Sequence, residues 1–247
     1  MRSSVCSYSF HRSFEDGAMD LDGYIAFCRD GGFSELDLWS RHVGDGDEAR
    51  LRESPVPVGS IAVDGADAWA PTEEERAANR ERAERWLDLA AAVDAETVRF
   101  NAGPFHYAFE PGTGTAEEFE AVVAGFTHLV DYGRGRGVEV VTENHWGPFQ
   151  HPDDLHRLLD AVPGLGLLFD TNNWPEDVRE QAWERYAPRA RTTHFKTIDP
   201  RAVELVKSGG YDGCWGIEIE GLPPGADERA AVTDALARLR PLVEGTA

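Results

Sequence analysis

The sequence predicts a (β/α)8 barrel, because short β-branched segments alternate with longer amphipathic segments from one end of the chain to the other. This alternation is typical of βα units that form a parallel sheet. The predicted strands span residues 5–10, 35–39, 58–63, 97–101, 139–144, 165–170, 192–196 and 215–220. Eight strands are the number that one barrel needs, so we expect residues 1–247 to form a single α/β domain.

Capping boxes mark the starts of two long helices between these strands. Thr72 with Glu75 begins a helix that we predict at 73–93. Thr115 with Glu118 begins another that reaches about residue 133. Three further helical patterns follow. Two are short, at 47–53 and 199–207, and a longer one at 227–243 would be the last helix of the barrel.

A doubly wound nucleotide-binding sheet is the competing fold, and the glycine pattern disfavours it. No Gly-x-Gly-x-x-Gly follows the first predicted strand, and the chain has no phosphate-loop motif. The cysteines Cys6, Cys28 and Cys214 lack the CxxC spacing of a thiolate zinc site. The first residues show no signal-peptide pattern, and no run approaches the ~20 apolar residues of a membrane span. We therefore expect a cytoplasmic protein.

The charge of the chain is unusual, with 24 basic against 45 acidic residues and a formal net charge of −21. Only Lys196 and Lys207 are lysines. A field of this sign repels phosphate groups, so we expect neither nucleic acid nor an anionic membrane as a partner. An acidic surplus with few lysines is also typical of proteins from salt-loving organisms, although an arginine-favouring genome produces the same pattern.

Four consecutive predicted strands end in residue types that bind metals. These residues are Glu143, Asp170, His194 and Glu218. Functional side chains of a (β/α)8 barrel lie at the C-terminal ends of the strands, so we expect the four to converge. Buried carboxylates need a compensating positive charge, and a single divalent cation would compensate three of them beside an imidazole. The sequence therefore predicts one divalent metal ion at the barrel mouth.

Each of these residues has a plainer explanation when it is taken alone. Asp170 could cap the following helix, and an isolated His194 is more often a hydrogen-bonded core histidine. Glu143 or Glu218 could pair with an arginine. Their joint occurrence at successive strand ends favours the metal site. Glu220 has the same strand parity as Glu218, and we choose Glu218 because Glu220 lies nearer the rim.

The strand ends resemble those of the xylose isomerase-like barrels, a group of sugar isomerases and epimerases, inosose dehydratases and hydroxypyruvate isomerases. The matching segments are Glu143-Asn144-His145, Phe169-Asp170-Thr171, His194-Phe195-Lys196 and Gly216-Ile217-Glu218. The first two predicted strands look like those of the group as well. The resemblance covers nearly the whole chain and is specific for the fold and the metal site, but not for the substrate.

The resemblance also implies roles for individual residues. Mn²⁺, Mg²⁺, Co²⁺ or Zn²⁺ is bound in that family by the residues that match Glu143, Asp170, His194 and Glu218. The two glutamates commonly serve as acid and base, and Glu218 matches the family's strand-eight glutamate. His145 and Lys196 would lie beside the metal as substrate-binding or supporting groups.

Zinc-dependent apurinic endonucleases belong to the same superfamily, and their ligand pattern is missing here. Asn101 stands where their fourth strand ends in a histidine, and Asn173 stands where a histidine follows their strand-six aspartate. No Asp-x-His follows the seventh strand. Together with the acidic composition, these differences disfavour DNA repair.

Aromatic residues gather in the segments that follow the predicted strands, and His106, Trp146 and Trp174 are the candidates for substrate contact. Aromatic faces suit the C–H faces of sugars, although any one of these rings could simply pack under a loop. We therefore expect a small sugar or polyol as the partner, and a homo-oligomer is compatible with the sequence.

Three functions are consistent with this pattern. The first is a metal-dependent isomerase or epimerase of an α-hydroxycarbonyl compound, in which Glu143 or Glu218 takes a proton from carbon and the other returns one. The second is a dehydratase, which differs only in needing a leaving hydroxyl β to the carbonyl. The third is a non-catalytic sugar-binding barrel, which an intact ligand set disfavours.

Overall fold

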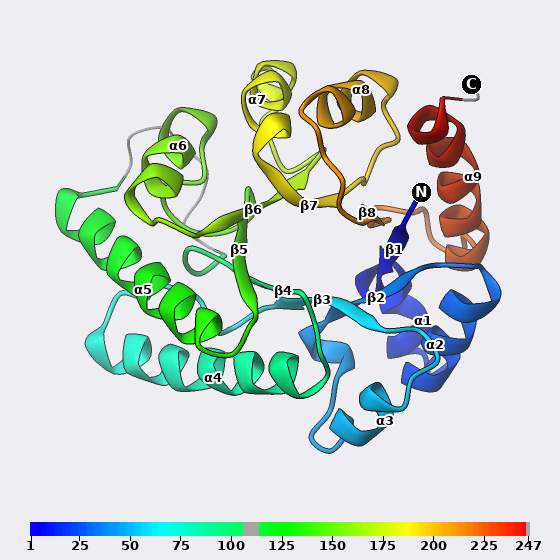
Figure 1. Cartoon of the computed structure of the whole chain (residues 1–247), viewed down its shortest axis with the longest axis horizontal. Coiled ribbons are helices and arrows are strands. Elements are labelled where there is room, and N and C mark those ends of the chain that lie inside the picture. Colours follow the sequence, from blue (N-terminus) through cyan, green and yellow to red (C-terminus); the bar gives the residue numbers. More distant parts are fainter. Residues whose placement is uncertain (106–113, 246–247) are drawn as a thin grey trace.

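A computed structural model describes residues 1–105 and 114–245 of the chain, and Figure 1 shows its strands as an inner ring with the helices outside. The strands are β1 (Ser3–Cys6), β2 (Glu35–Trp39), β3 (Val58–Val63), β4 (Thr97–Phe100), β5 (Glu139–Glu143), β6 (Gly166–Asp170), β7 (Ala190–His194) and β8 (Trp215–Ile217). Neighbouring strands pair in parallel in the order β7-β6-β5-β4-β3-β2-β1-β8. The predicted α/β barrel is therefore confirmed.

The ring is closed between β7 and β8 by a single isolated bridge between Phe195 and Ile217. The Phe195 N–H donates to the carbonyl oxygen of Gly216 at 2.8 Å. Gly216 has to be glycine here, because a Cβ on it would lie 2.1 Å from the Thr193 carbonyl oxygen. The barrel is thus nearly closed, with one lightly bonded seam.

The helices cover the outside of this ring. They are α1 (His11–Glu15), α2 (Leu21–Asp30), α3 (Glu48–Arg52), α4 (Glu73–Ala92), α5 (Ala116–Arg134), α6 (Pro152–Ala161), α7 (Arg179–Tyr186), α8 (Pro200–Ser208) and α9 (Glu228–Glu244), with 3-10 turns η1 (Ser7–Phe10), η2 (Ser40–His42) and η3 (Ala187–Arg189). Both predicted capping boxes are present, at the starts of α4 and α5. Within the described residues, none of these helices is long and apolar enough to cross a membrane.

β1 and β8 end three or more residues earlier than the sequence predicted, and serine hydroxyls explain both differences. After β1, the Ser7 Oγ accepts the Trp39 N–H at 2.9 Å, and the chain turns into η1 instead of continuing as a strand. After β8, the Ser9 Oγ accepts the Ile219 N–H at 2.9 Å. A side-chain acceptor thus replaces the carbonyl that a longer ladder would supply.

Apolar side chains of the strands and the surrounding helices form one continuous core, which includes the fully buried Leu36, Ile61, Leu87, Phe126 and Leu155. Many of the buried charged residues lie at or near the C-terminal ends of strands, among them Asp37, Arg99, Glu143, Asp170 and His194. The fold therefore places its costly polar groups together at one end of the barrel.

Candidate active site

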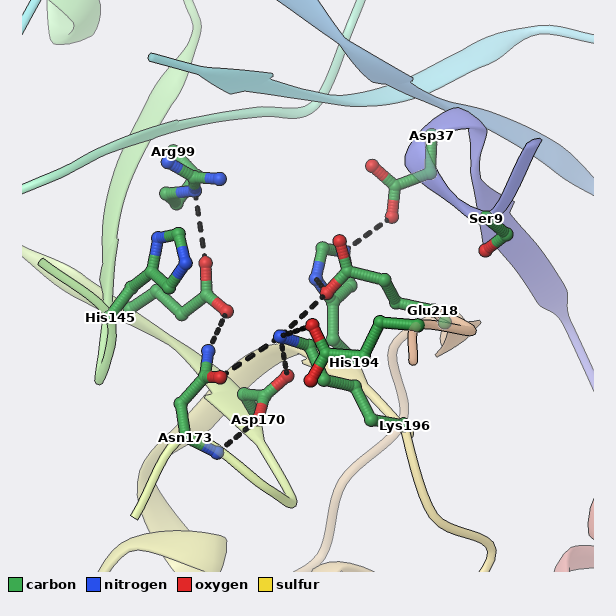
Figure 2. Close-up of polar contacts among 12 residues, drawn as sticks. Ser9, Asp37, Arg99, His145, Asp170, Asn173, His194, Lys196 and Glu218 are labelled. Atoms are coloured by element: carbon green, nitrogen blue, oxygen red, sulfur yellow. Dashed lines mark hydrogen bonds and ion pairs between the residues drawn. The ribbon is translucent and has the colours of Figure 1, made fainter. Parts of the chain in front are cut away.

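The four side chains predicted to bind a metal lie together. Ligand atoms from Glu143, Asp170, His194 and Glu218 all lie within 4.8 Å of one another, and all four residues are buried. They come from the ends of β5, β6 and β7 and from the position directly after β8. Figure 2 shows this cluster from close by. Glu220 lies outside it and is more exposed, so the structure places Glu218 at the strand-eight position.

Asp170 divides its two oxygens between the backbone and the cluster. Its Oδ1 accepts the N–H groups of Asn172 and Asn173, both at 2.7 Å. Its buried Oδ2 has no hydrogen-bond partner among the described residues and lies 3.6 Å from the Lys196 Nζ. Burial raises the pKa of Asp170, although Lys196 acts against this. One oxygen therefore has the simple turn-capping role, and the other is available as a ligand.

His194 is oriented by a carboxylate on its far side. Its Nε2 lies 2.9 Å from the Oδ2 of Asp37, a buried residue of β2. Because a carboxylate only accepts, Nε2 carries the proton and Nδ1 faces Glu218 Oε2 at 3.2 Å, without hydrogen-bond geometry. Burial disfavours a charged imidazole, but Glu218 and Asp37 outweigh it and raise the pKa of His194 well above its usual value.

Lys196 brings a positive charge to the same cluster. Its Nζ lies 3.3 Å from Glu218 Oε2 and 3.1 Å from Glu220 Oε2, and it donates to Asn173 Oδ1 at 2.9 Å. Burial disfavours the ammonium form, but the surrounding carboxylates, Asp170 first, raise the pKa of Lys196 well above its usual value. For Glu218, burial acts to raise the pKa, but Lys196 and His194 outweigh it and hold the pKa well below the usual value.

Glu143 lies on the other side of the cluster beside Arg99 of β4. Arg99 Nε lies 3.1 Å from Glu143 Oε2, and its Nη1 lies 2.9 Å from the Oδ1 of Asp64. Asn173 Nδ2 donates to the second Glu143 oxygen at 2.8 Å. Burial raises the pKa of Glu143 to about 7, against the opposing effect of Arg99. Both oxygens of this carboxylate therefore have partners.

A cavity of about 260 Å³ opens onto the cluster. Its polar lining includes Lys196, Glu218 and Arg99, and its aromatic lining includes Tyr8, Trp39, His145 and Trp146. His145 stacks on Trp146, and Tyr8 meets Trp39 edge to face. Apolar ring faces beside charged groups are suited to a small polyhydroxylated molecule.

The polar network behind this wall fixes the proton of His145. Asn101 Oδ1 accepts from Arg99 Nη1 at 2.9 Å, and Asn101 Nδ2 donates to Asp64 Oδ1 at 3.2 Å. The His145 Nδ1 lies 3.1 Å from the same Asn101 Oδ1, so Nδ1 must be the donor. Burial and the charge of Arg99 lower the pKa of His145, which leaves its Nε2 as a hydrogen-bond acceptor.

The three predicted aromatic contacts are placed differently from one another. Trp146 lines the cavity, whereas Trp174 is buried, stacks on Tyr186 and donates its Nε1 proton to the Asp170 carbonyl oxygen at 3.0 Å. Trp174 thus packs inward, because the turn at Asp170 folds it toward the core. His106 lies outside the described residues.

Sequence reasoning missed Asp37, Asp64 and Arg99, although each is a charged residue in or directly after a strand. That position was itself a signal, because an ionised side chain in a buried strand needs a partner. The sequence did not specify which charged side chains pair. Asp37 of β2 contacts His194 of β7, and Arg99 of β4 lies between Asp64, after β3, and Glu143 of β5.

The residues of the cluster fit a divalent metal ion. Carboxylates and imidazoles are ligands of Mn²⁺, Mg²⁺, Co²⁺ and Zn²⁺, and these ions differ in the ratio of oxygen to nitrogen donors that they prefer. Two of the donor atoms, Asp170 Oδ2 and His194 Nδ1, are buried without a hydrogen-bond partner among the described residues. The Asp37 contact on His194 is the outer carboxylate that histidine ligands of metals usually have.

The fold and the cluster together define a TIM barrel with a possible carboxylate and histidine metal site at its mouth. The chain belongs to the xylose isomerase-like TIM barrel family, whose model matches residues 48–202.

Curated relatives in this family are inosose dehydratases. The enzyme of Bacillus anthracis is 32% identical over 98 residues, which cover 38% of this chain and 33% of that protein. The enzyme of Serratia proteamaculans is 30% identical over 99 residues, which cover 37% of this chain and 33% of that protein. The match thus spans about a third of the length of these relatives.

Solved structures with the same fold include both epimerases and a dehydratase. A D-psicose 3-epimerase has a TM-score of 0.77 at 15% identity, covering 98% of this chain and 99% of its own. An L-ribulose 3-epimerase has a TM-score of 0.76 at 14% identity, covering 99% and 95%. A probable 3-DHS dehydratase of Bacillus anthracis has a TM-score of 0.71 at 16% identity, covering 98% of both chains. At these identities the likeness shows a shared fold.

Proposed function

We propose that this protein is a metal-dependent enzyme that isomerises or epimerises a small sugar or other α-hydroxycarbonyl compound by moving a proton on carbon. One observation carries the proposal: four ligand-type side chains from successive strand ends place their donor atoms within 4.8 Å of one another, beside a small aromatic-walled cavity. A non-catalytic barrel would have no need for this buried and strongly charged cluster.

In this proposal Glu143, Asp170, His194 and Glu218 hold one divalent ion, which when bound supplies a Lewis acid for a carbonyl group. The chain's own residues do the rest of the chemistry. A glutamate accepts the proton from the carbon next to the carbonyl. Lys196 keeps Glu218 ionised for this role.

The cavity walls would position the substrate. Trp39 and Trp146 offer flat apolar faces, and the His145 Nε2 offers an acceptor for a hydroxyl group. The volume of about 260 Å³ suits one small molecule. Residues 1–247 would act as one domain, since the eight strands form one sheet that runs from β1 to β8. Cytoplasmic location, absence of nucleic acid and a homo-oligomer remain predictions.

A dehydratase is the second candidate, because the curated relatives are inosose dehydratases and one structural neighbour is a probable 3-DHS dehydratase. The same glutamate would remove the proton from carbon and then return it to a leaving hydroxyl group, which departs as water. The substrate alone separates this reaction from isomerisation, since elimination needs a hydroxyl β to the carbonyl.

The test combines metal analysis with hydrogen exchange. Protein purified without chelator is analysed for metal, then loaded with Mn²⁺ or Co²⁺ and incubated in D₂O with D-fructose, L-ribulose or inosose. We expect one metal per chain and, with a sugar that is accepted, deuterium on the carbon beside the carbonyl. Protein that binds no divalent ion and exchanges no hydrogen with any of these sugars would contradict the proposal.

A further inference from the structure

A buried glutamate joins the segment after β1 to the start of α9. Arg12, in α1, donates through its Nε to Glu228 Oε1 at 3.1 Å. Ser13 donates its N–H and its hydroxyl group to the other Glu228 oxygen, at 3.1 and 2.5 Å. Glu228 lies in the first turn of α9 and is 4% exposed. Burial acts to raise the pKa of Glu228, but hydrogen bonds from Ser13 and Arg12 outweigh it and hold the pKa below its usual value. An ionised carboxylate therefore ties α1 to α9.

The same guanidinium also holds the chain between β8 and α9. Arg12 Nη1 donates to the carbonyl oxygens of Leu222 and Pro223 at 3.4 and 2.9 Å, and its Nη2 donates to that of Ala226 at 3.2 Å. These carbonyls belong to a segment without helix or strand. Arginine presents its donors in a planar fork, so one side chain can fix several acceptors at once. Arg12, Ser13 and Glu228 are called the Arg12 clamp below.

Backbone contacts join the same two segments on the barrel side. β8 pairs with β1 from Trp215 to Ile217, and the Ile219 N–H donates to Ser9 Oγ at 2.9 Å. One isolated bridge joins β8 to the β7 side. In Figure 1, β1 and β8 are neighbours in the ring and α9 lies outside them. The chain around β8 is therefore held more firmly to β1 than to β7.

The predicted metal ligands lie on both sides of this weak seam between β7 and β8. Glu218 directly follows β8, whereas Glu143, Asp170 and His194 end β5, β6 and β7. Across the seam, Glu218 Oε2 lies 3.2 Å from His194 Nδ1 and 3.3 Å from Lys196 Nζ. A metal site tolerates deviations of only about 0.2 Å in its ligand distances. The position of the β8 segment relative to β7 thus determines whether Glu218 can complete the cluster.

We propose that Arg12 is a positioning residue for Glu218, because it joins α1 to the segment between β8 and α9 and so holds Glu218 against the ligand residues across the seam. This inference rests on the proposed function and adds a residue that neither belongs to the cluster nor lines the cavity. Two lining residues, Tyr8 and His11, directly precede the clamp in the chain. The clamp therefore holds one wall of the cavity together with Glu218.

The first experiment separates positioning from a purely structural role. A clamp that only stabilised the fold would lower the free energy of unfolding but leave the metal affinity of the folded protein unchanged. Arg12→Met should raise the Kd for Co²⁺, followed by its visible absorption, about 2- to 30-fold, the range for residues that act on a site without touching its ligand. Arg12→Lys keeps the ion pair but not the fork, so its Kd should be intermediate. An unchanged Kd in folded Arg12→Met would overturn the proposal.

A matched control is a pair that also joins neighbouring elements but lies at the surface. Arg201 Nη2 of α8 lies 2.9 Å from Glu184 Oε1 of α7, and both side chains are exposed. Arg201→Met should leave the Kd for Co²⁺ unchanged, and an equal rise in the two variants would contradict a specific role for Arg12. Circular dichroism establishes folding. Glu228→Gln, which removes the charged partner and keeps its size, takes the place of Arg12→Met if that variant does not fold.

The second experiment is hydrogen exchange with mass spectrometry on metal-free protein. Amides at 215–220 should exchange faster in Arg12→Met than in the unchanged protein, while those of β4 and β5 should keep their rates. Equal exchange at 215–220, or a rise of the same size throughout the chain, would overturn the proposal. If the unchanged protein binds no Co²⁺, the proposed metal-dependent function is wrong, and the exchange at 215–220 then decides by itself whether the clamp holds this segment.

Discussion

The two sides of the barrel mouth treat their charges in different ways. On the β3–β5 side, Asp64, Arg99 and Glu143 form a chain of short contacts in which the cation lies between two carboxylates. On the β6–β8 side, Lys196 faces Asp170, Glu218 and Glu220, and some carboxylate oxygens have no hydrogen-bond partner among the described residues. The first arrangement pairs its cation with two carboxylates, although Arg99 Nε makes no hydrogen bond within the described residues, and the second leaves Asp170 Oδ2 available as a ligand atom.

The difference indicates which charged groups hold the structure in place and which are available to bind a ligand or react with it. A fully paired buried network is expensive to disturb and holds its members in one geometry. Oxygens without partners cost stability and persist where a ligand or a reaction uses them. We therefore expect substitutions on the two sides to affect different measurements.

The largest effect should come from Glu218→Gln. The amide cannot accept a proton from carbon, so turnover and deuterium exchange should fall about 10²–10⁴-fold, the usual range for loss of a general base. Steady-state rates and exchange in D₂O measure this with the best sugar found. Metal content has to be measured in the same sample, because the amide is also a poorer ligand. Glu220→Gln, at the exposed rim, is the matched control and should change the rate far less.

On the paired side, the main loss should be in stability. Arg99→Met leaves Asp64 and Glu143 buried without their cation, which should lower the free energy of unfolding by about 3–5 kcal/mol. Denaturant unfolding at fixed salt measures the change. Arg238→Met removes an exposed pair with Asp234 and should cost about 0–1 kcal/mol. Equal losses in the two variants would mean that the buried network is no more valuable than a surface pair.

A smaller effect should follow from Asp37→Asn, which changes the partner of His194 without touching the cluster directly. An amide can present its own N–H to the ring and so disturb the tautomer that leaves Nδ1 facing Glu218. Loss of an outer carboxylate of this kind typically weakens metal binding about 10–100-fold. Titration with Co²⁺, followed by its visible absorption, gives the affinity. Unchanged affinity would show that packing alone orients His194.

The smallest expected effect is that of salt on stability, which concerns the exposed surface charges and not the buried charges of the barrel mouth. If the net charge of −21 repels itself across the surface, molar KCl should raise the thermal midpoint, because salt screens exposed charges and leaves buried pairs nearly unaffected. Arg99→Met should gain the same increment as the unchanged protein. A midpoint that does not move with salt would leave genome composition as the explanation of the acidic sequence.

The fold was predictable because its signal is repeated along the whole chain. Each strand and helix pattern adds independent support, and the capping boxes at Thr72 and Thr115 fix two helix starts by local hydrogen bonds. Strand ends were less predictable, since Ser7 and Ser9 accept the N–H groups of Trp39 and Ile219, which are distant in sequence. Length and pattern alone do not encode such contacts.

The candidate ligands were predictable for a related reason: they occupy one topological position on four successive strands. Their supporting residues were not, because the Asp37–His194 contact joins positions 157 residues apart. The inward position of Trp174 was not predictable for the same reason, since the turn at Asp170 directs it into the core. Single-residue roles that depend on long-range pairing therefore need the structure.

The bridge between β7 and β8 also determines how independently Glu218 can move. β8 has only 3 residues, and although it pairs with β1 along its length, one isolated bridge joins it to the β7 side. Backbone amides with few ladder partners open by local fluctuation more readily than those in the middle of a sheet. Amides at 215–219 should therefore exchange with solvent sooner than those of β4 and β5. Glu218 thus follows a strand that can move with little loss of backbone hydrogen bonds. Glu143 lies in a strand that is bonded on both sides and moves less.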